Sequence, residues 1–280
     1  MSGEDLRKIN WKGSLPVVLT LSPKSVSTPT LPAPIHALVH RQTYLHIALE
    51  DYIHKLYEFA PTLYFRSKIV QEEPGDEDDD EVDEIKDTSF ASTERSEPRK
   101  PELPVCWFED EVTQQPLRWH HFTGVLADLR STRELPWRLI LHFSNYPSSI
   151  LPFESPRSFY KNSLKQALCI RHGTAKVALN LTKADHGTLW DAIQYQQYTN
   201  IAMDDSDPKL IPVRVLHKSN PPIQRRCPVD WTLRDLLEKW KVPGIAFVAG
   251  VVPDLSTPIW DLWKALAHPD QFLYVLVNDS

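Results

Sequence analysis

The residues that could carry out chemistry in this chain are three cysteines, eleven histidines and a few lysines near its middle. Cys169 precedes His172 by three residues, so a helix would place a thiol close to an imidazole. Such a pair could act as the nucleophile of an acyl-transfer or conjugating enzyme. A structural cysteine is the alternative, because cysteine is among the residues most often buried. No Gly-x-Ser-x-Gly motif is present, and the sequence contains no other group typical of an active site.

The histidines do not form a recognisable metal-binding pattern. His36 and His40 are four residues apart in a segment that we expect to be a strand, where this spacing is too long for joint ligation. His120 and His121 are adjacent, which is a poor geometry for one shared ion. His-Glu-x-x-His, Cys/His clusters and the glycine-rich nucleotide-binding motifs are all missing from the sequence. We therefore expect neither a metal nor a cofactor.

Lys165 lies within a predicted helix from Ser155 to Gly173. Ser155 can cap it, a proline follows at the first helical position, and Gly173 can end it in the left-handed conformation. Apolar residues recur at helical spacing on one face: Phe159, Tyr160, Leu164, Ala167 and Leu168. Lys161, Asn162 and Lys165 are expected on the opposite face. Spacing alone is compatible with an ordinary surface lysine.

The composition limits the classes of protein to which the chain can belong. Its 280 residues suggest two domains, or one domain with additions, and the hydrophobic share of 41% permits substantial cores. The net charge of -6 makes nucleic acid an unexpected partner. Three cysteines without a CxxC pair indicate a reducing compartment. The beginning of the chain does not resemble a signal peptide, and no segment resembles a membrane span, so any membrane association should be peripheral.

The elements before residue 144 predict a mixed sheet wrapped around one helix, as in a β-grasp fold. A short amphipathic helix over 5–11 precedes strands at 15–21 and 36–40, the second antiparallel to the first, and a helix over 44–59 that Thr43 could cap. Strands are expected at 103–109, 117–119 and 135–143, with a short helix over 122–129. Residues 71–101 are acidic and rich in Ser, Thr and Pro, which predicts a disordered insertion.

The same order of elements is expected again near the C-terminus. Strands at 210–216 and 223–227 precede a helix over 233–240 capped by Thr232, a strand at 245–251, a helix opened by Thr257 and Pro258, and a last strand at 272–277. A helical region separates the two copies. It contains the helix of Lys165, a segment at 175–181, and a helix over about 183–203 with Thr182 and Asp185 as a capping box.

Taken together, these segments predict an α+β protein. We expect an N-terminal helix over 1–12, a first β-grasp domain over 13–146, a helix-rich domain over 147–207, and a second β-grasp domain over 208–280. Nine tryptophans are many for this length, and they could fill cores or line grooves between the units. The sequence does not show which tryptophans fill cores and which line grooves.

Several short stretches, each weak alone, occur in an order that resembles the autophagy protein 5 family. They span nearly the whole chain apart from its loops: 11–19, 40–45, 106–109, 116–120, 124–129, 135–137, 142–143, 163–166, 189–190 and 268–274. The resemblance implies two ubiquitin-like domains that flank a helix-rich domain. Two features depart from the family pattern: the insertion at 71–101, and His121-Phe122 in place of an aromatic-proline step.

The resemblance also implies a function. A lysine on the helix after the first ubiquitin-like domain forms an isopeptide bond with the C-terminal glycine of the ubiquitin-like modifier autophagy protein 12. Leu164-Lys165-Gln166 fits the family pattern of a hydrophobic residue, lysine and a polar residue, and the nearby Lys161 and Lys176 do not. Lys165 is therefore the expected acceptor, a substrate of the autophagy conjugating enzymes and not a catalytic group.

The conjugate is then expected to bind the coiled-coil protein autophagy protein 16. The assembly would act like a ligase in the transfer of autophagy protein 8 to phosphatidylethanolamine. This implies a cytoplasmic protein that is recruited peripherally to the preautophagosomal membrane. Two alternatives remain open: a conjugating enzyme that uses Cys169, and an adaptor of two modules that is never conjugated.

Overall fold

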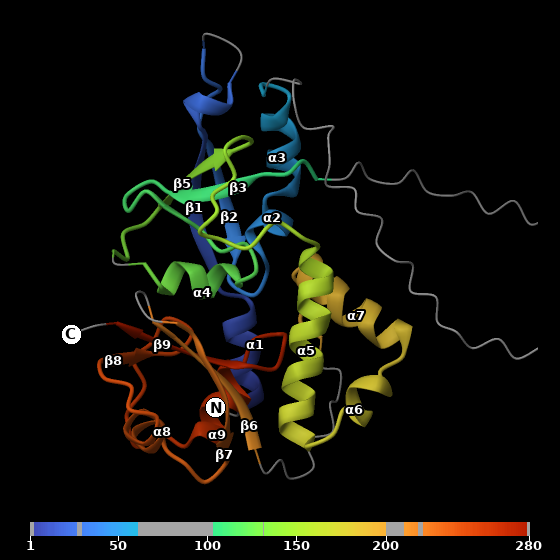
Figure 1. The fold of residues 1–280 in the computed structure, drawn as a ribbon, viewed down its shortest axis with the longest axis vertical. Helices are drawn as coiled ribbons and strands as arrows, with labels where there is room; N and C mark the ends of the chain where they lie inside the picture. The colour runs from blue at the N-terminus through green and yellow to red at the C-terminus, as the bar shows by residue number, and fades with distance from the viewer. Residues whose placement is uncertain are drawn as a thin grey trace, which may run out of the picture.

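The computed structural model describes residues 3–26, 30–60, 103–130, 132–199, 210–217 and 221–278. The acidic insertion expected at 71–101 lies outside these residues. Two separate sheets are present, and a group of helices lies beside the junction between them (Figure 1). The mixed α+β architecture expected from the sequence is therefore confirmed.

The first sheet has the strand order β2-β1-β5-β3-β4. Its strands are β1 (Ser14–Leu21), β2 (Ile35–His40), β3 (Trp107–Asp110), β4 (Gln115–Pro116) and β5 (Trp137–His142). β1 and β5 are parallel and central, with Val17 opposite Trp137 and Leu19 opposite Leu139. All four side chains are almost completely buried, which fits central strands that pack against helices. β2 pairs antiparallel with β1, as the sequence predicted.

The helix expected over 44–59 is divided in two. α2 (Leu45–Ala48) and α3 (Glu50–Tyr57) are separated by Leu49, whose φ of -111° and ψ of 12° are not helical. The predicted cap at Thr43 is wrong, because Tyr44 is the N-cap and makes no side-chain cap bond. The Thr43 carbonyl oxygen instead accepts hydrogen bonds from the backbone and hydroxyl of Thr123 in α4 (Thr123–Asp128). Thr43 therefore joins two elements.

Two strands of the first sheet also differ from expectation. The strand expected over 103–109 begins only at Trp107, where it pairs with β5. The strand expected over 117–119 is wrong, because the ladder with β3 lies at Gln115 and Pro116. Trp119 is buried instead by an irregular contact, in which its indole N–H donates to the carbonyl oxygens of Leu151 and Pro152.

The second sheet repeats the topology of the first. Its strand order is β7-β6-β9-β8, and it contains β6 (Leu210–His217), β7 (Ile223–Pro228), β8 (Ile245–Phe247) and β9 (Leu273–Asn278). The central pair β6 and β9 is parallel, and the other two pairs are antiparallel, as in the matching strands of the first sheet. The strand expected over 245–251 ends early, at Phe247. The two copies of one fold are therefore confirmed.

Helices cover the second sheet and connect it to the rest of the molecule. α8 (Leu233–Lys239) begins with the predicted Thr232 cap, and α9 (Ile259–Leu266) follows Pro258, its N-cap. The N-terminal helix α1 (Gly3–Trp11) packs against α9, with the guanidinium of Arg7 5.5 Å from the ring centre of Trp263 (Figure 1).

The helical region contains α5 (Pro156–His172), α6 (Lys176–Leu179) and α7 (Lys183–Gln194). Both predicted links of the Thr182–Asp185 capping box are present. α7 ends at Gln194, whereas the sequence predicted a helix to about residue 203. The prediction is therefore wrong for residues 195–199, and residues 200–203 lie outside the described part of the chain. A shared core joins all three units, with Tyr44 and Phe122 from the first, Tyr160 from α5, and Phe272 and Tyr274 from the second.

Candidate functional site

The helix that carries Lys165 forms as its sequence predicts. The Ser155 hydroxyl accepts a hydrogen bond from the backbone of Ser158, Pro156 occupies the first turn, and Gly173 ends the helix with φ at 68°. A residue with a side chain is strained at that φ, which explains why glycine suits the position. α5 is therefore a helix with defined ends that lies alongside the second sheet (Figure 1).

The two faces of α5 have opposite environments. Tyr160, Leu164, Ala167 and Leu168 are completely buried in the core that joins the three units. Lys165 is exposed, although it immediately follows Leu164. The structure thus holds the backbone at Lys165 firmly from one side and leaves its amine accessible from the other.

A buried polar cluster attaches α5 to the second sheet. One carboxylate oxygen of Asp270 accepts hydrogen bonds from the Ser163 hydroxyl at 2.6 Å, the Tyr274 hydroxyl at 2.8 Å and the Arg214 guanidinium at 3.1 Å. Burial raises the pKa of Asp270, and the Arg214 charge and these hydrogen bonds oppose that rise. The second oxygen of Asp270 accepts from the backbone of Phe272, so both oxygens act as acceptors and Asp270 forms a buried ion pair with Arg214. The cluster fixes α5 against β6 and β9.

Arg214 extends this attachment to the surface next to Lys165. Its Nε donates to Gln224 at 2.8 Å, and the Gln224 amide donates to Gln166 at 3.2 Å. Gln166 is the polar residue that follows Lys165. The side chain of Gln166, next to Lys165, is thus hydrogen-bonded to the second sheet.

Positive charge surrounds Lys165. Burial lowers the pKa of His186 on α7, and the charges of Lys161, Lys165 and Arg157 lower it further, while Asp185 opposes them. These three cations follow one another at intervals of four residues, so they lie along one face of α5. This face is suited to a partner with acidic groups.

The other candidates suggested by the sequence lie in different environments. Lys161 is half-buried, whereas Lys176 is exposed at the start of α6. Cys169 is an exposed free cysteine one turn after Lys165. Cys106 and Cys227 are buried, which raises the pKa of both thiols, that of Cys227 to about 12. Among the cysteines, only Cys169 is therefore accessible to a reagent or a partner.

Within the described ranges, no group of three or more His, Cys, Asp and Glu side chains could hold a metal ion. None of the helices described is both long and apolar enough to cross a membrane. His36 and His40 both lie on β2, and His120 and His121 lie at the junction of the units with ring centres 4.4 Å apart.

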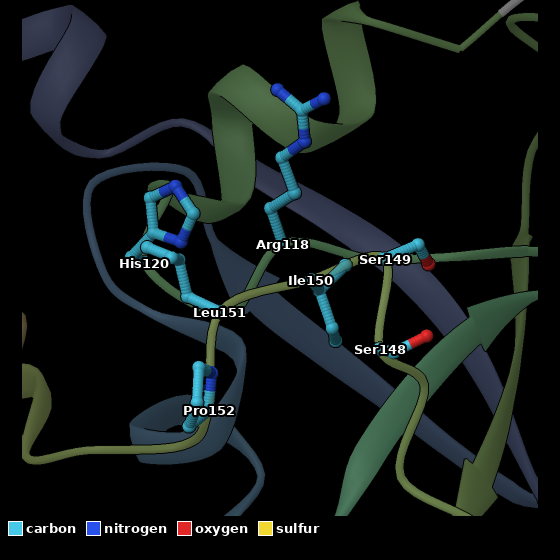
Figure 2. Close-up of a pocket in the computed structure, with 7 residues that line it drawn as sticks. All are labelled: Arg118, His120, Ser148, Ser149, Ile150, Leu151 and Pro152. Carbon is cyan, nitrogen blue, oxygen red and sulfur yellow. The ribbon is translucent and has the colours of Figure 1, made fainter.

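A cavity of about 410 Å³ lies between the segment that follows β4 and the segment that leads to α5. Arg118, His120, Ser148 and Ser149 supply its polar groups. Figure 2 shows that the guanidinium of Arg118 extends away from the two serine hydroxyl groups. The polar groups do not converge on one point, so this cavity is not a preorganised binding site.

The tryptophans mainly fill cores. Trp137 and Trp263 are almost completely buried, and Trp119, Trp190 and Trp107 are also buried. The four others are half-buried, Trp11, Trp231, Trp240 and Trp260. The Asp270–Arg214 cluster was not recognised from the sequence, although Asp270 belongs to the 268–274 stretch. The pairing depends on a contact between residues 56 positions apart, which no local pattern shows.

The fold and this helix define a class of protein: two β-grasp units packed with a helical region, in which Lys165 is exposed on α5. Three family models match the chain, all described as Autophagy protein ATG5. The UblA domain matches residues 10–72 and 82–143, the alpha-helical bundle region matches 154–202, and the UblB domain matches 210–277.

Known relatives agree with these models. Autophagy protein 5 of Aspergillus clavatus is 31% identical over 264 residues, which covers 68% of this chain and 81% of that protein. Autophagy protein 5 of Oryza sativa subsp. japonica is 40% identical over 98 residues, which covers 33% of this chain and only 25% of that protein. The crystal structure of Kluyveromyces marxianus Atg5 has a TM-score of 0.71 at 22% identity and covers 98% of this chain and 99% of that chain.

The chain belongs to the autophagy protein 5 family, as the sequence resemblance indicated. Its two β-grasp units are the ubiquitin-like UblA and UblB domains, which flank the helical bundle. Membership supports a role in autophagy.

Proposed function

We propose that Lys165 is the residue through which this chain is joined to the ubiquitin-like modifier autophagy protein 12. The observation that carries the proposal is the exposure of Lys165 on a helix whose opposite face is completely buried. An acceptor amine must reach a thioester held by another protein. A lysine on a rigid, accessible helix meets this requirement.

The chemistry that we propose is aminolysis. The unprotonated Lys165 amine attacks the thioester carbonyl between the modifier's terminal glycine and the conjugating enzyme's cysteine. The C–S bond breaks, the enzyme's thiol is released, and the nitrogen loses a proton to give the isopeptide. The conjugating enzyme supplies the activated carbonyl, and this chain supplies the nucleophile and its position.

The positive face around Lys165 supports its selection over other lysines. Lys161 and Arg157 lie on the same side of α5, so an approaching enzyme with an acidic surface would be drawn to this helix. Lys161 is partly covered, and Lys176 lies on the separate helix α6. Lys165 combines exposure with the positive surroundings.

The wider role follows from family membership. We infer that the conjugate binds the coiled-coil protein autophagy protein 16 and promotes transfer of autophagy protein 8 to phosphatidylethanolamine. The chain itself is then a non-catalytic scaffold in the cytoplasm, recruited as a peripheral protein to the preautophagosomal membrane. The shared core of the three units supports a scaffold role, since it holds them in one arrangement.

A reconstituted conjugation reaction tests the proposal. The full chain is incubated with the modifier, its activating and conjugating enzymes and ATP, and products are separated with and without reducing agent. Lys165→Arg should abolish the thiol-resistant conjugate, whereas Lys161→Arg and Lys176→Arg should retain it. A stable conjugate on Lys165→Arg would show that the acceptor is elsewhere.

The same reaction separates the alternative functions. Exposure of Cys169 favours it as the only competing nucleophile among the cysteines. A conjugating enzyme would give an adduct that reducing agents cleave and that Cys169→Ser removes. An unconjugated adaptor would give no adduct in any variant, although the enzymes still charge with modifier.

A further inference from the structure

β2 forms an open edge of the first sheet. It pairs with β1 on one side, and no other strand of the described residues pairs with it. Pro16 of β1 lies opposite Leu38 and has no N–H, so this pair is of the non-hydrogen-bonded type. The backbone groups of His36 and Leu38 therefore point away from β1, toward the open side of the sheet.

The hydrogen bonds at both ends of β1 confirm this alternation. The Ser22 N–H donates to the carbonyl oxygen of Leu141 at 2.9 Å, so the even-numbered residues of β1 direct their backbone groups to β5. At the other end, the Arg41 N–H donates to the carbonyl oxygen of Gly13 at 2.9 Å, so the odd-numbered residues are the ones that bond to β2. The even-numbered residues of β2 are thus left without a strand beside them.

The two sheets end in four edge strands, and β2 differs from the other three. β4 has two residues and β8 has three, so both offer little backbone for pairing. β7 has six residues, but Arg225 and Arg226 are exposed on it and Pro228 ends it. Short strands, charges and prolines are the usual protection of a sheet edge against pairing with another chain. β2 has six residues with no proline and no Lys, Arg, Asp or Glu, so its edge is unprotected.

Apolar side chains lie on both faces of β2 at this edge. Leu38 is 71% exposed on one face, beside the half-buried Pro16. Ile35 and Ala37 lie on the other face, half-buried at the border of the first core. A strand added at the edge would cover side chains on both faces. Its own side chains should therefore be apolar on both faces at its centre.

The charge around β2 favours carboxylates at the ends of that added strand. Residues 6–49, which include β1 and β2, contain no Asp or Glu but have three lysines and two arginines. Lys12 is exposed just before the start of β1, which lies opposite His40 at the end of β2. Arg41 contributes less, because it pairs with Asp128. An acidic segment would be attracted to this edge.

We propose that β2 binds an extended segment of a partner protein, which adds a strand to the first sheet. The segment pairs through its backbone with His36 and Leu38. Its central side chains are apolar and cover Leu38 on one face and Ala37 on the other, and its ends carry carboxylates. Strand addition at an open sheet edge is a general mode of peptide recognition, in which main-chain hydrogen bonds supply affinity. The assignment does not depend on conjugation at Lys165.

A capped heptapeptide, acetyl-Glu-Thr-Val-Val-Val-Thr-Glu-amide, tests the assignment on the unconjugated full chain. Amide hydrogen exchange is followed by NMR as the peptide is added. Saturating peptide should slow exchange of the His36 and Leu38 amides at least ~10-fold. The amides of Ala37 and Val39 already bond to β1 and should not change. No protection of His36 and Leu38 at up to about 1 mM peptide would overturn the proposal.

A second peptide shows whether backbone pairing is the cause. The same heptapeptide with its three valines N-methylated keeps its side chains but cannot donate from those positions, and it should bind at least ~10-fold more weakly. Equal binding of the two peptides would overturn the proposal. So would protection of the same amides that appears without peptide and rises with protein concentration, because a second copy of the chain would then occupy the edge.

Two matched variants locate the binding. Leu38→Asp places a charge on the edge at an exposed position and should reduce affinity for the heptapeptide at least ~10-fold. Leu179→Asp makes the same exchange on α6, where the leucine is 73% exposed, and should bind like the unmodified chain. If Leu38→Asp binds normally, the peptide does not occupy this edge.

Discussion

The burial of His46 predicts a specific loss of stability in acid. The ring is 1% exposed, and its Nε2 lies 3.2 Å from the carbonyl oxygen of Cys106. A carbonyl oxygen only accepts, so Nε2 carries the proton and Nδ1 does not. Nδ1 is buried without a partner among the described residues. A second proton would therefore have nowhere to donate, and burial lowers the pKa of His46 to about 4.

The direction of this pH effect on stability follows from the difference between the His46 pKa values of the folded and unfolded chain. The unfolded chain has an ordinary His46 pKa of 6.5, so it binds a proton below that pH while the folded chain does not. Above pH 6.5 both states are neutral and stability is unaffected. As pH falls from 6.5 toward 4, the unfolded state is increasingly favoured. The loss is about 1 kcal/mol between pH 7.5 and 5.5, and about 3 kcal/mol in total well below pH 4.

Urea unfolding of a His46→Gln variant measures this contribution. Glutamine can still donate to Cys106 but does not titrate. The variant should be less stable than the unmodified chain at pH 7.5, and the difference should narrow by about 1 kcal/mol at pH 5.5. Leu45→Ala is the control, because it damages the same core and keeps His46, so its deficit should not depend on pH. A His46→Gln deficit that stays constant or widens in acid would refute the reasoning.

Three further predictions concern stability and can be measured by urea or thermal unfolding. Asp270→Ala should destabilise the chain by about 3–5 kcal/mol because it leaves the Arg214 charge buried and unpaired. Combining it with Arg214→Met should recover part of that loss. If the losses in unfolding free energy of the two single variants simply add in the double variant, the ion pair is contradicted. Gly244→Ala should destabilise by ~1–3 kcal/mol, since φ is 117° and the added carbon would lie 2.5 Å from the Asn278 carbonyl oxygen. Gly187→Ala is its matched control in the helix α7, where the added carbon meets nothing within 4 Å, and it should stabilise by ~0.5–1 kcal/mol. Thr182→Ala should remove one capping box and destabilise by ~0.5–2 kcal/mol, and an unchanged midpoint would show that the box contributes nothing.

Local patterns predicted the elements whose causes are local. The ends of α5 follow from Ser155, Pro156 and Gly173, and the start of α8 follows from its N-cap, Thr232. Caps can be predicted because they depend on residues a few positions apart. The strands of both sheets other than β4 were also predicted from the sequence. The recurring order of elements then predicted two copies of one fold, which the matching strand orders confirm.

Expectations failed where distant contacts overrule local preference. Thr43 looks like a helix cap, but Thr123 hydrogen-bonds to its backbone. The residues after Pro116 suit a strand, but Trp119 is held outside the sheet by the carbonyl oxygens of Leu151 and Pro152. These bonds join residues tens of positions apart, so no window of sequence contains both partners.

The sequence by itself determined which helix carries the candidate lysine, where that helix begins and ends, and which of its faces is apolar. Helical periodicity alone placed Lys165 outside the apolar stripe that contains Tyr160 and Leu164. Only the tertiary structure decided that this apolar face would be buried between two ubiquitin-like domains and bonded to one of them through Asp270. This burial depends on the packing of residues from all three units, and such long-range contacts leave no local periodicity in the chain.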